Sequence, residues 1–212
     1  MNNFDASVKI FNDFASEYAD RFMDIESYRI HFDKFRDLID TSEPDILELG
    51  CGPANVTRYL KQSFPQSKIL ALDLAPRMIE IAKRNLQEVD YRVMDVRDIK
   101  TLDLTFNSIM CSFCLPFLSK QDAEKLISDC SIKLKKNGVL YLSTMEGDET
   151  KSGFESTSFS GDSQVFFYYH RQSDIENSLQ KNGFSIEYNV RQNYYESDGT
   201  ITIDLIMIAK KK

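Results

Sequence analysis

The sequence predicts an α/β fold, in which helices flank a doubly wound sheet of seven mostly parallel strands. Two observations lead to this prediction. From residue 45 onward, short apolar runs alternate with amphipathic segments of helical periodicity, which is typical of parallel strands joined by helical crossovers. Two final apolar runs, 184–195 and 200–210, follow each other with only a turn between them. They predict an antiparallel hairpin at the end of the sheet.

The bulk properties are those of a single domain. A chain of 212 residues is one domain by default and can bury a large core without disulfides. The net charge of −7 argues against a general affinity for nucleic acid. The first residues are polar, the four cysteines lie in apolar or semi-apolar surroundings, and no apolar run reaches the ~18 residues of a membrane span. We therefore expect a reduced, cytoplasmic protein without a nucleic acid partner.

Residues 8–39 are predicted to be helical, because they contain neither Gly nor Pro and place apolar side chains three and four residues apart. Phe11, Phe14 and Tyr18 show this spacing. A mostly polar stretch at 24–27 indicates a break between two helices. Because these helices precede the first strand, we expect them either to cover the carboxyl edge of the sheet or to pack against the domain.

The first predicted strand runs into a glycine turn and then into a helix. Gly50 and Gly52 allow positive φ angles and let a ligand approach the bare backbone. The dinucleotide fingerprint G-x-G-x-x-G is incomplete, because Asn55 stands where its last glycine belongs. An alternative frame, acidic-x-G-x-G-x-small, begins at Glu48 and ends at Ala54. Either frame predicts a nucleotide-type cleft, whereas a glycine turn alone could simply close a strand–helix unit.

Two later strands end in carboxylates. Asp73 ends the apolar run 68–73, and a parallel strand would bring it beside the glycine turn. There it could accept hydrogen bonds from two ribose hydroxyls, as in several classes of nucleotide-binding enzyme. Asp95 follows the third strand, where it could serve as a loop or N-cap carboxylate.

The next two strands are predicted at 106–111 and 139–145. Between them, residues 120–136 have a helical pattern, and Asn137 and Gly138 provide a stop signal for that helix.

The remaining chain contains a loop, a strand, a helix and the hairpin. Residues 146–162 are rich in Gly, Ser, Thr and acidic residues and predict a long loop. An aromatic run at 165–170 predicts a strand, and Ser173 is expected to cap a helix that extends to about Gln180. The turn of the final hairpin is predicted at 197–199.

Cys111 and Cys114 form a C-x-x-C pair at the end of the fourth predicted strand. A redox or metal site could use this pair. However, no second pair exists and His31 and His170 are the only histidines, so a four-ligand zinc site is hard to assemble. Because free cysteines are commonly buried, we interpret the pair as two small apolar residues and predict no metal.

From Asp45 onward, the chain resembles the class I S-adenosylmethionine (SAM)-dependent methyltransferases, in particular their small-molecule members. The similarity lies in five ordered motifs, E-L-G-C-G-P-A-N, A-L-D-L-A-P-R-M, M-D-V-R-D, S-I-M-C-S-F and K-K-N-G-V-L-Y-L, and covers about four fifths of the chain. Ala54 departs from the family pattern, in which a third glycine is usual, and Asn107 stands where an acid is common. The resemblance implies a Rossmann-like fold and an enzyme that transfers a methyl group from SAM to a small molecule.

The resemblance also implies a cofactor site. The methionine end is expected at Glu48, Gly50, Gly52 and Asn55, and the ribose at Asp73. The adenine is expected at Leu74, Met78, Asp95 and Val96. Ser112 and Phe113 are expected to complete the wall. Tyr18 is similar to an aromatic residue that closes over the cofactor in relatives. Within one domain, 1–212, the expected parts are a helical cap (1–40), a cofactor-binding core (41–145), a variable substrate loop (146–164) and a terminal strand, helix and hairpin (165–212).

The sequence leaves the methyl acceptor and the oligomeric state open. Aromatic residues from Phe154 to Tyr169 indicate an apolar or aromatic acceptor pocket, or else the packed face of a strand. No catalytic residue is assigned, although Glu146, Tyr169 and His170 could act as a base if the acceptor must lose a proton. We expect the cap and the loop 146–162 to close together over bound SAM.

Two other functions are compatible with the sequence. One is an NAD-dependent oxidoreductase, which the missing third glycine at Asn55 disfavours. The other is a protein that binds SAM or a partner without catalysis, which no feature of the sequence excludes.

Overall fold

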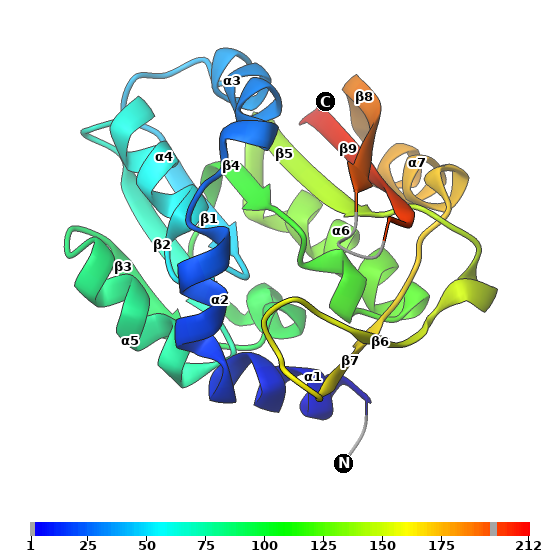
Figure 1. Ribbon diagram of the computed structural model, residues 1–212. Coiled ribbons are helices and arrows are strands. Elements are labelled where there is room, and N and C mark those ends of the chain that lie inside the picture. The colour runs from blue at the N-terminus through cyan, green and yellow to red at the C-terminus, as the bar shows by residue number, and fades with distance from the viewer. Residues whose placement is uncertain (1–2, 196–198) are drawn as a thin grey trace.

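The computed structural model describes residues 3–195 and 199–212, and its centre is a twisted sheet of seven strands (Figure 1). The strands are β1 (Asp45–Leu49), β2 (Lys68–Asp73), β3 (Asp90–Val93), β4 (Phe106–Cys111), β5 (Leu134–Met145), β8 (Phe184–Tyr195) and β9 (Ile201–Lys211). They lie in the order β3-β2-β1-β4-β5-β9-β8. β1 pairs in parallel with β2 and β4, while β9 pairs antiparallel with β5 and β8. The predicted fold class is therefore confirmed.

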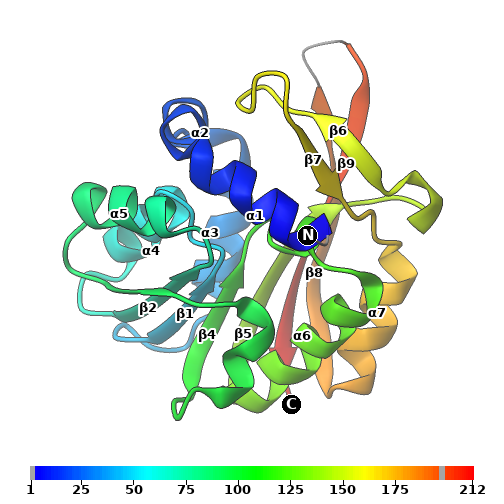
Figure 2. The same cartoon turned by 90° about the horizontal axis from the view of Figure 1, so that it is seen from below.

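Helices cover both faces of the sheet (Figure 2). The α-helices are α1 (Asn3–Asp13), α2 (Ala15–Phe22), α3 (Arg29–Asp37), α4 (Asn55–Ser63), α5 (Pro76–Asn85), α6 (Lys120–Lys133) and α7 (Gln172–Lys181). Short 3₁₀ turns are η1 (Glu26–Tyr28), η2 (Val96–Thr101), η3 (Leu115–Phe117) and η4 (Glu149–Lys151). One apolar core joins the sheet to α3, α4 and α5, and the other joins it to α6 and α7.

The central strands are buried on both faces, so their side chains alternate between the two cores. Along β1, Leu47 and Leu49 enter the core beneath α6 and α7, whereas Ile46 enters the core beneath α4. All three side chains are fully buried. This double burial is the reason for an almost continuous apolar run in the sequence.

The order of the strands creates a crevice at their carboxyl ends. β2 lies on one side of β1 and β4 on the other, so the loops that follow β1 and β4 lead to opposite faces of the sheet. Open α/β sheets bind their ligands at such a switch point.

The N-terminal segment contains three α-helices rather than the predicted two. It is helical from Asn3, and the break predicted near 24–27 is present just before η1. An additional break occurs at Phe14, whose ψ angle of 28° is not helical. It gives α1 and α2 different directions (Figure 1), and α2 packs on α5 in a small cluster that contains Ala19 and Met78.

α3 belongs to the main core rather than to a detachable cap. Phe32 and Phe35 are buried, and their ring centroids lie 5.4 and 5.9 Å from that of Tyr141 in β5. Beside α3, Tyr28 Oη donates a hydrogen bond to the carboxylate of Asp204 in β9, at 2.6 Å. The segment predicted as a cap therefore has two structural parts, of which only α1 and α2 lie outside the core.

The prediction of a structureless loop at 146–162 is wrong, because a separate two-stranded sheet begins there. Its strands are β6 (Gly153–Ser156) and β7 (Gln164–Phe167), which pair antiparallel. The register places Phe154 opposite Phe166, and their ring centroids are 5.1 Å apart. β6 is short and largely polar, so its sequence gives no strand signal without the partner strand. The aromatic strand predicted after this segment is confirmed as β7.

α6 ends earlier than predicted, at Lys133, because the chain passes directly into β5. Asn137, at φ 62°, is left-handed within that strand segment. A Cβ on Gly138 would lie 2.9 Å from the carbonyl oxygen of Lys135. The Asn-Gly pair therefore serves a close backbone approach rather than the end of a helix.

α7 and the final hairpin are close to the prediction. α7 begins at Gln172 with Arg171 as its N-cap, so Ser173 lies within the first turn and does not cap the helix. β8 and β9 have nearly the predicted bounds. Of the predicted turn between them, Ser197 and Asp198 lie outside the described residues.

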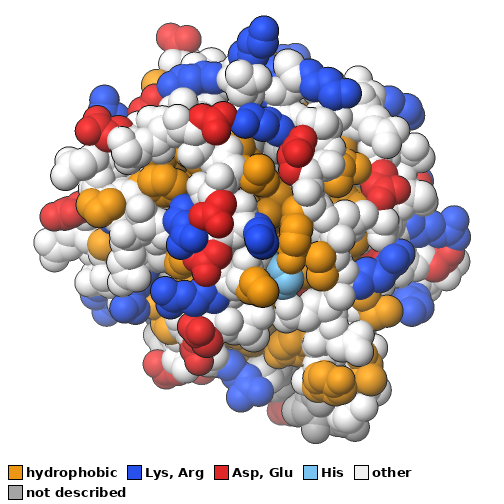
Figure 3. All heavy atoms as spheres, turned by 90° about the horizontal axis from the view of Figure 1, so that it is seen from above, with side chains coloured by type: hydrophobic (Ala, Val, Ile, Leu, Met, Phe, Trp, Pro, Cys, Tyr) orange, Lys and Arg blue, Asp and Glu red, His pale blue; other side chains and the backbone are white. Residues whose placement is uncertain are grey.

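The surface carries both signs of charge. On the face shown in Figure 3, acidic and basic side chains are intermixed. Within 3–195 and 199–212, no helix combines the length and the apolar character that crossing a bilayer requires.

Candidate functional site

The glycine turn after β1 places three alternate residues in the left-handed region. Gly50, Gly52 and Ala54 have φ angles of 68°, 51° and 72°. For a residue with a Cβ, this conformation costs about 1–2 kcal/mol, which explains why glycine is usual at the third position. Ala54 is fully buried and is the N-cap residue of α4. The turn therefore keeps its shape although only two of the three positions are glycines.

Asp73 is fixed beside this turn by backbone hydrogen bonds. Its Oδ2 accepts from the N–H of Gly52 and its Oδ1 from the N–H of Ala75, both at 2.9 Å. Burial raises the pKa of Asp73, and these backbone hydrogen bonds oppose the rise. A carboxylate has about four acceptor positions, so Asp73 can accept further hydrogen bonds from a ligand.

A cavity of about 110 Å³ lies above the turn, at the carboxyl ends of β1, β2 and β4. The predicted cofactor residues that line it are Tyr18, Gly50, Gly52, Asp73, Leu74, Met78, Val96, Ser112 and Phe113. The topology of the sheet brings these residues together from separate segments of the chain. Sites for small organic ligands have volumes of about 300–1,000 Å³, so the cavity must widen to admit one.

Glu48, Asn55 and Asp95 belong to the predicted site but do not line the cavity. Glu48 is buried beneath the turn. The Nδ2 of Asn55 donates to the carbonyl oxygen of Phe22 at 2.9 Å, which joins α4 to the end of α2. Asn55 therefore holds the cap helix against the glycine turn.

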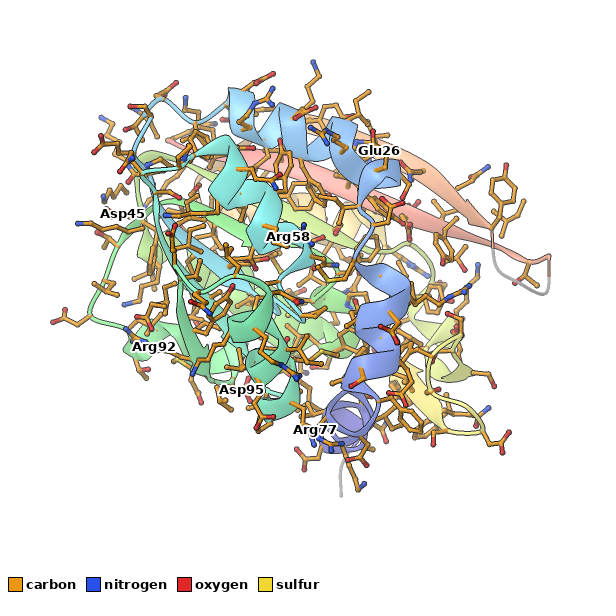
Figure 4. All side chains as sticks on the ribbon, turned by 60° about the vertical axis from the view of Figure 1, so that its left-hand side comes forward. Glu26, Asp45, Arg58, Arg77, Arg92 and Asp95 are labelled. Carbon is orange, nitrogen blue, oxygen red and sulfur yellow. The ribbon has the colours of Figure 1, made fainter. Side chains whose placement is uncertain are left out.

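Asp95 caps η2 and forms an ion pair with Arg97. Its Oδ1 accepts from the backbone N–H of Arg97 at 2.9 Å, and its Oδ2 accepts from Nη2 at 2.6 Å. The guanidinium carbon lies 3.8 Å from the ring centre of Phe4 in α1. Figure 4 shows Asp95 at the same end of the molecule as α1. One arginine thus connects Asp95 to the cap, next to Val96 in the cavity wall.

Aromatic rings close the cavity on the side of the cap. Phe159, in the loop between β6 and β7, has its ring centroid 5.2 Å from that of Phe11 and 5.1 Å from that of Tyr18. The two segments predicted to close together over a ligand therefore touch each other. Phe154 was expected to share this role, but it is 51% exposed and packs on Phe166.

The first turn of α1 also contributes to the cavity, and sequence reasoning missed it because the predicted helix begins at Val8. Phe4, Ser7, Val8 and Phe11 all line the cavity. Their spacing of three and four residues marks one face of a helix. Extending this periodicity towards the N-terminus would have found Phe4 and Ser7, which precede the predicted helix. The other unpredicted lining residues are Ala75, Cys114, Phe117 and Leu118.

The three residues considered as bases do not line this cavity. Glu146 pairs with Arg191, with 2.6 Å between Oε1 and Nη2, and this guanidinium lowers the pKa of Glu146. His170 is buried, its Nε2 donates to a backbone carbonyl oxygen at 2.9 Å, and burial lowers its pKa. Tyr169 packs against the glycine that follows Glu146. All three hold the segment after β5 in place.

The titratable side chains in the lining are Tyr18, Asp73 and Cys114. Burial is the main cause that raises the pKa of Tyr18 to about 12. A hydrogen bond with Cys111, together with burial, raises the pKa of Cys114. Tyr18 and Cys114 therefore keep their protons at neutral pH.

The cysteines do not form a metal centre in the described part of the chain. Cys51, Cys111, Cys114 and Cys130 are free and buried. No group of three or more His, Cys, Asp or Glu side chains there is placed to hold a metal ion. Cys111 and Cys114 pack in the core, in agreement with the interpretation of the C-x-x-C pair as small apolar residues.

Solved structures share this fold over nearly the whole chain. The magnesium protoporphyrin IX methyltransferase of Synechocystis PCC 6803 with bound SAM has a TM-score of 0.69 and 16% identity, over 100% of this chain and 98% of that chain. A SAM-dependent methyltransferase of Anabaena variabilis has a TM-score of 0.71 and 16% identity, over 97% of this chain and 95% of that chain. The fold is therefore that of the class I SAM-dependent methyltransferases.

Sequence relatives agree with this class over part of the chain. The demethylmenaquinone methyltransferase of Thermotoga maritima is 27% identical over 114 residues, which are 54% of this chain and 49% of that protein. The malonyl-[acyl-carrier protein] O-methyltransferase of Bacillus anthracis is 35% identical over 107 residues, which are 50% of this chain and 38% of that protein. The matched region thus spans less than half the length of these relatives.

A family model matches the segment of the chain that contains the site. Residues 46–138 match the model of a family described as a methyltransferase domain. This segment includes the glycine turn, Asp73 and Asp95. The resemblance inferred from the five motifs is therefore confirmed for residues 46–138, which form less than half of the chain.

Proposed function

We propose that the protein transfers a methyl group from SAM to a small apolar or aromatic acceptor. The observation that carries this proposal is the arrangement at the switch point of the sheet, where Asp73 accepts a hydrogen bond from the N–H of Gly52 and both residues line one cavity. SAM supplies an activated methyl group on a sulfonium. The chain has to position the acceptor and exclude water, and positioning alone can supply about 7–11 kcal/mol of the barrier reduction.

The lining residues fit the chemical parts of this cofactor. Asp73 would accept hydrogen bonds from the ribose hydroxyls, and the bare backbone at Gly50 and Gly52 would border the methionine part. Leu74 and Met78 would contact the adenine ring. Val96 would contact the adenine edge, and Ser112 and Phe113 would form the far wall. Asp95, which does not line the cavity, would support Val96 from outside it.

The aromatic rings of the cap would exclude water and favour the cofactor. Tyr18 lies over the turn, with a ring carbon 3.7 Å from the position of a Cβ on Gly52. Aromatic faces attract cations, so these rings would also stabilise a sulfonium. Their apolar surface supports an acceptor that is itself apolar or aromatic.

The protonation states of the lining support an acceptor whose nucleophile is already ionised or strongly acidic. Tyr18 and Cys114 keep their protons, Asp73 is held by two backbone N–H groups, and Glu146 is paired with Arg191. A carboxylate or an acidic phenol needs no general base. The names of two relatives fit these features, since demethylmenaquinone is an apolar quinone and a malonyl thioester carries a carboxylate.

The test has two stages. Calorimetry should show S-adenosylhomocysteine (SAH) binding at micromolar Kd, on the order of −8 kcal/mol. Transfer of labelled methyl from SAM should then be measured with aromatic hydroxyl compounds of graded acidity and with carboxylic acids, and the more acidic acceptors should react faster.

The same test distinguishes the two alternative functions, an NAD-dependent oxidoreductase and a non-catalytic binding protein. No binding heat and no thermal shift at millimolar SAH would contradict the proposal, and binding of NADH instead would favour the oxidoreductase. SAH binding without transfer to any acceptor would favour a non-catalytic protein.

A cytoplasmic location is also proposed, because the four cysteines are free and buried, which suits a reducing compartment.

A further inference from the structure

Glu48 is a buried carboxyl group that the proposed cofactor contacts leave without a role. Its side chain is 2% exposed, and within the described residues its Oε2 has no hydrogen-bond partner. It lies on the face of β1 that is covered by α4, opposite to Leu47 and Leu49. A carboxylate in such a place is unstable unless a cation or several donors compensate it.

Among the described residues, the side chains that act on the Glu48 carboxyl are a hydroxyl and a second carboxyl, and none is a cation. The register of the sheet aligns Glu48 with Ala71 of β2, and Ala71 with Tyr91 of β3, so the small Ala71 leaves room between the two larger side chains. Tyr91 Oη, and Thr57 Oγ1 from α4, are buried and likewise have no hydrogen-bond partner in the described chain. These hydroxyls can hydrogen-bond a neutral carboxyl group.

The titratable neighbours of Glu48 oppose its ionisation. Asp73, at the end of β2, and Cys51, in the turn, face the same site, as does the phenol of Tyr91. Burial, with a smaller contribution from Asp73, raises the pKa of Glu48 to about 8, although the nearby hydroxyl of Thr57 opposes this rise. Glu48 therefore carries a proton at neutral pH.

We infer that Glu48 holds a proton while the cavity contains no cation and releases this proton when a sulfonium cofactor binds. The inference rests on the proposed function. Gly50 lines the cavity and lies just after β1, two residues from Glu48, so the two Cα atoms are about 7 Å apart. A positive charge at this range in a poorly solvated site favours the carboxylate. The O–H bond breaks, its electron pair stays on the carboxylate oxygen, and the proton passes to solvent.

This exchange would let the protein distinguish its cofactor from the product. SAM carries the sulfonium charge, whereas SAH has lost it with the methyl group. After transfer, Glu48 would take up a proton again and the favourable charge pair would disappear. Proton release makes the affinity for SAM rise with pH up to the pKa of Glu48, while the affinity for SAH stays nearly constant.

The test compares the two ligands on the intact wild-type protein. Calorimetry with SAM and with SAH at pH 7, in two buffers of different ionisation enthalpy, gives the number of protons released. We expect a release that approaches one proton for SAM and is close to zero for SAH. The ratio of Kd for SAH to Kd for SAM should rise severalfold between pH 6 and 7.5 and level off above the pKa of Glu48. The sulfonium lowers the pKa of the amino group of SAM relative to that of SAH, so the same titrations on Glu48→Gln give the part of the pH dependence that belongs to the ligands.

Equal proton release for the two ligands would overturn the inference and leave the proposed function intact. If neither ligand binds, the proposed function itself fails. Glu48→Gln, which replaces the carboxyl by a neutral group of equal size, should release fewer protons with SAM than the wild type does, and its ratio should depend less on pH. Tyr91→Phe removes a neighbouring hydroxyl but keeps the carboxyl, so it should still release the proton. A folded Glu48→Gln protein that releases as many protons as the wild type contradicts the inference, and if this variant does not fold, the wild-type comparison decides.

Discussion

At the scale of single residues, Asp73 has two tasks. It holds the N–H of Gly52, which fixes the glycine turn, and it offers its remaining acceptor positions to the cavity. Asp95 is different, because its carboxylate is already engaged by Arg97, and it connects the cavity wall to α1. Two acids that look equivalent in the sequence therefore have different surroundings, and their substitutions should have different consequences.

Asp73→Ala should lower the affinity for SAH by a hundredfold or more. The variant loses two hydrogen bonds from hydroxyls to a charged group, each worth about 1.5–3 kcal/mol, as well as the support of the turn. Calorimetry measures the loss. The matched control is Asp174→Ala, because Asp174 pairs with Lys120 away from the cavity lining. Equal affinities of the two variants would show that Asp73 is not a cofactor ligand.

Glu146→Gln should change kcat by less than about threefold, because Glu146 does not line the cavity and its carboxylate pairs with an exposed arginine. Arg191→Gln breaks the same ion pair from the other side and should have a similarly small effect. General-base catalysis contributes about 10²–10⁴-fold, so a loss of that size in Glu146→Gln alone would identify this residue as the base after all.

At the scale of elements, the cap and the β6–β7 sheet support each other. Phe159 joins them, since its buried ring contacts Phe11, Tyr18 and Phe22. The β6–β7 sheet has only two strands, and such a hairpin is at best marginally stable alone. Its order therefore depends on the aromatic contacts with the cap.

Phe159→Ala should loosen the cap without unfolding the domain. Removing a buried Phe costs about 3 kcal/mol, which corresponds to roughly a hundredfold in the opening equilibrium. Amide hydrogen exchange in α1 and α2 should become faster by up to that factor, and SAH should bind more weakly. Phe154→Ala is the matched control on the same hairpin, because Phe154 is 51% exposed and should change neither quantity. Similar exchange in both variants would contradict a role of Phe159 in holding the cap.

The elements predicted correctly are those whose residues carry their own signal. β1 and β2 are buried on both faces, so their apolar runs are visible in the sequence, and the alternating pattern of β8 is a surface strand pattern. β6 could not be predicted, because Gly153–Ser156 is a strand only through its pairing with β7. Phe4 and Ser7 of α1 were missed for a different reason, since the helix was predicted to begin at Val8 rather than at Asn3.

At the scale of the whole molecule, the cavity is small and is covered by the rings of Phe11, Tyr18 and Phe159, so the structure is in a closed state. A cavity of about 110 Å³ is too small for a nucleoside cofactor, and its roof consists of α1, α2 and the β6–β7 loop. These parts lie outside the main cores, whereas α3 is anchored in the core by Phe32 and Phe35. Opening should therefore involve α1 and α2 but not α3.

Addition of SAH should slow hydrogen exchange in α1, α2 and residues 153–167, with little change in β1, because loosely packed segments are the ones that a ligand orders. Deleting residues 3–22 should weaken the binding of SAH and abolish turnover, while the sheet still folds. A deletion that extends to residue 40 should fail to fold, since it removes Phe32 and Phe35 from the core. Full SAH affinity after the shorter deletion, together with unchanged exchange, would show that the two helices are only packing elements.

The hydrogen bond from Tyr28 to Asp204 has a consequence for the way the protein is made. The two residues are 176 positions apart, so the beginning of the chain leaves the ribosome long before its partner exists. At translation speeds of about 5–20 residues per second, the delay is roughly 9–35 s. During this time η1 and α3 lack the strand β9 that holds them, and their apolar side chains are open to chaperones. The sheet is complete only when β9 pairs with β5 and β8. A ribosome that stalls before β9 would therefore leave a chain that cannot complete its core.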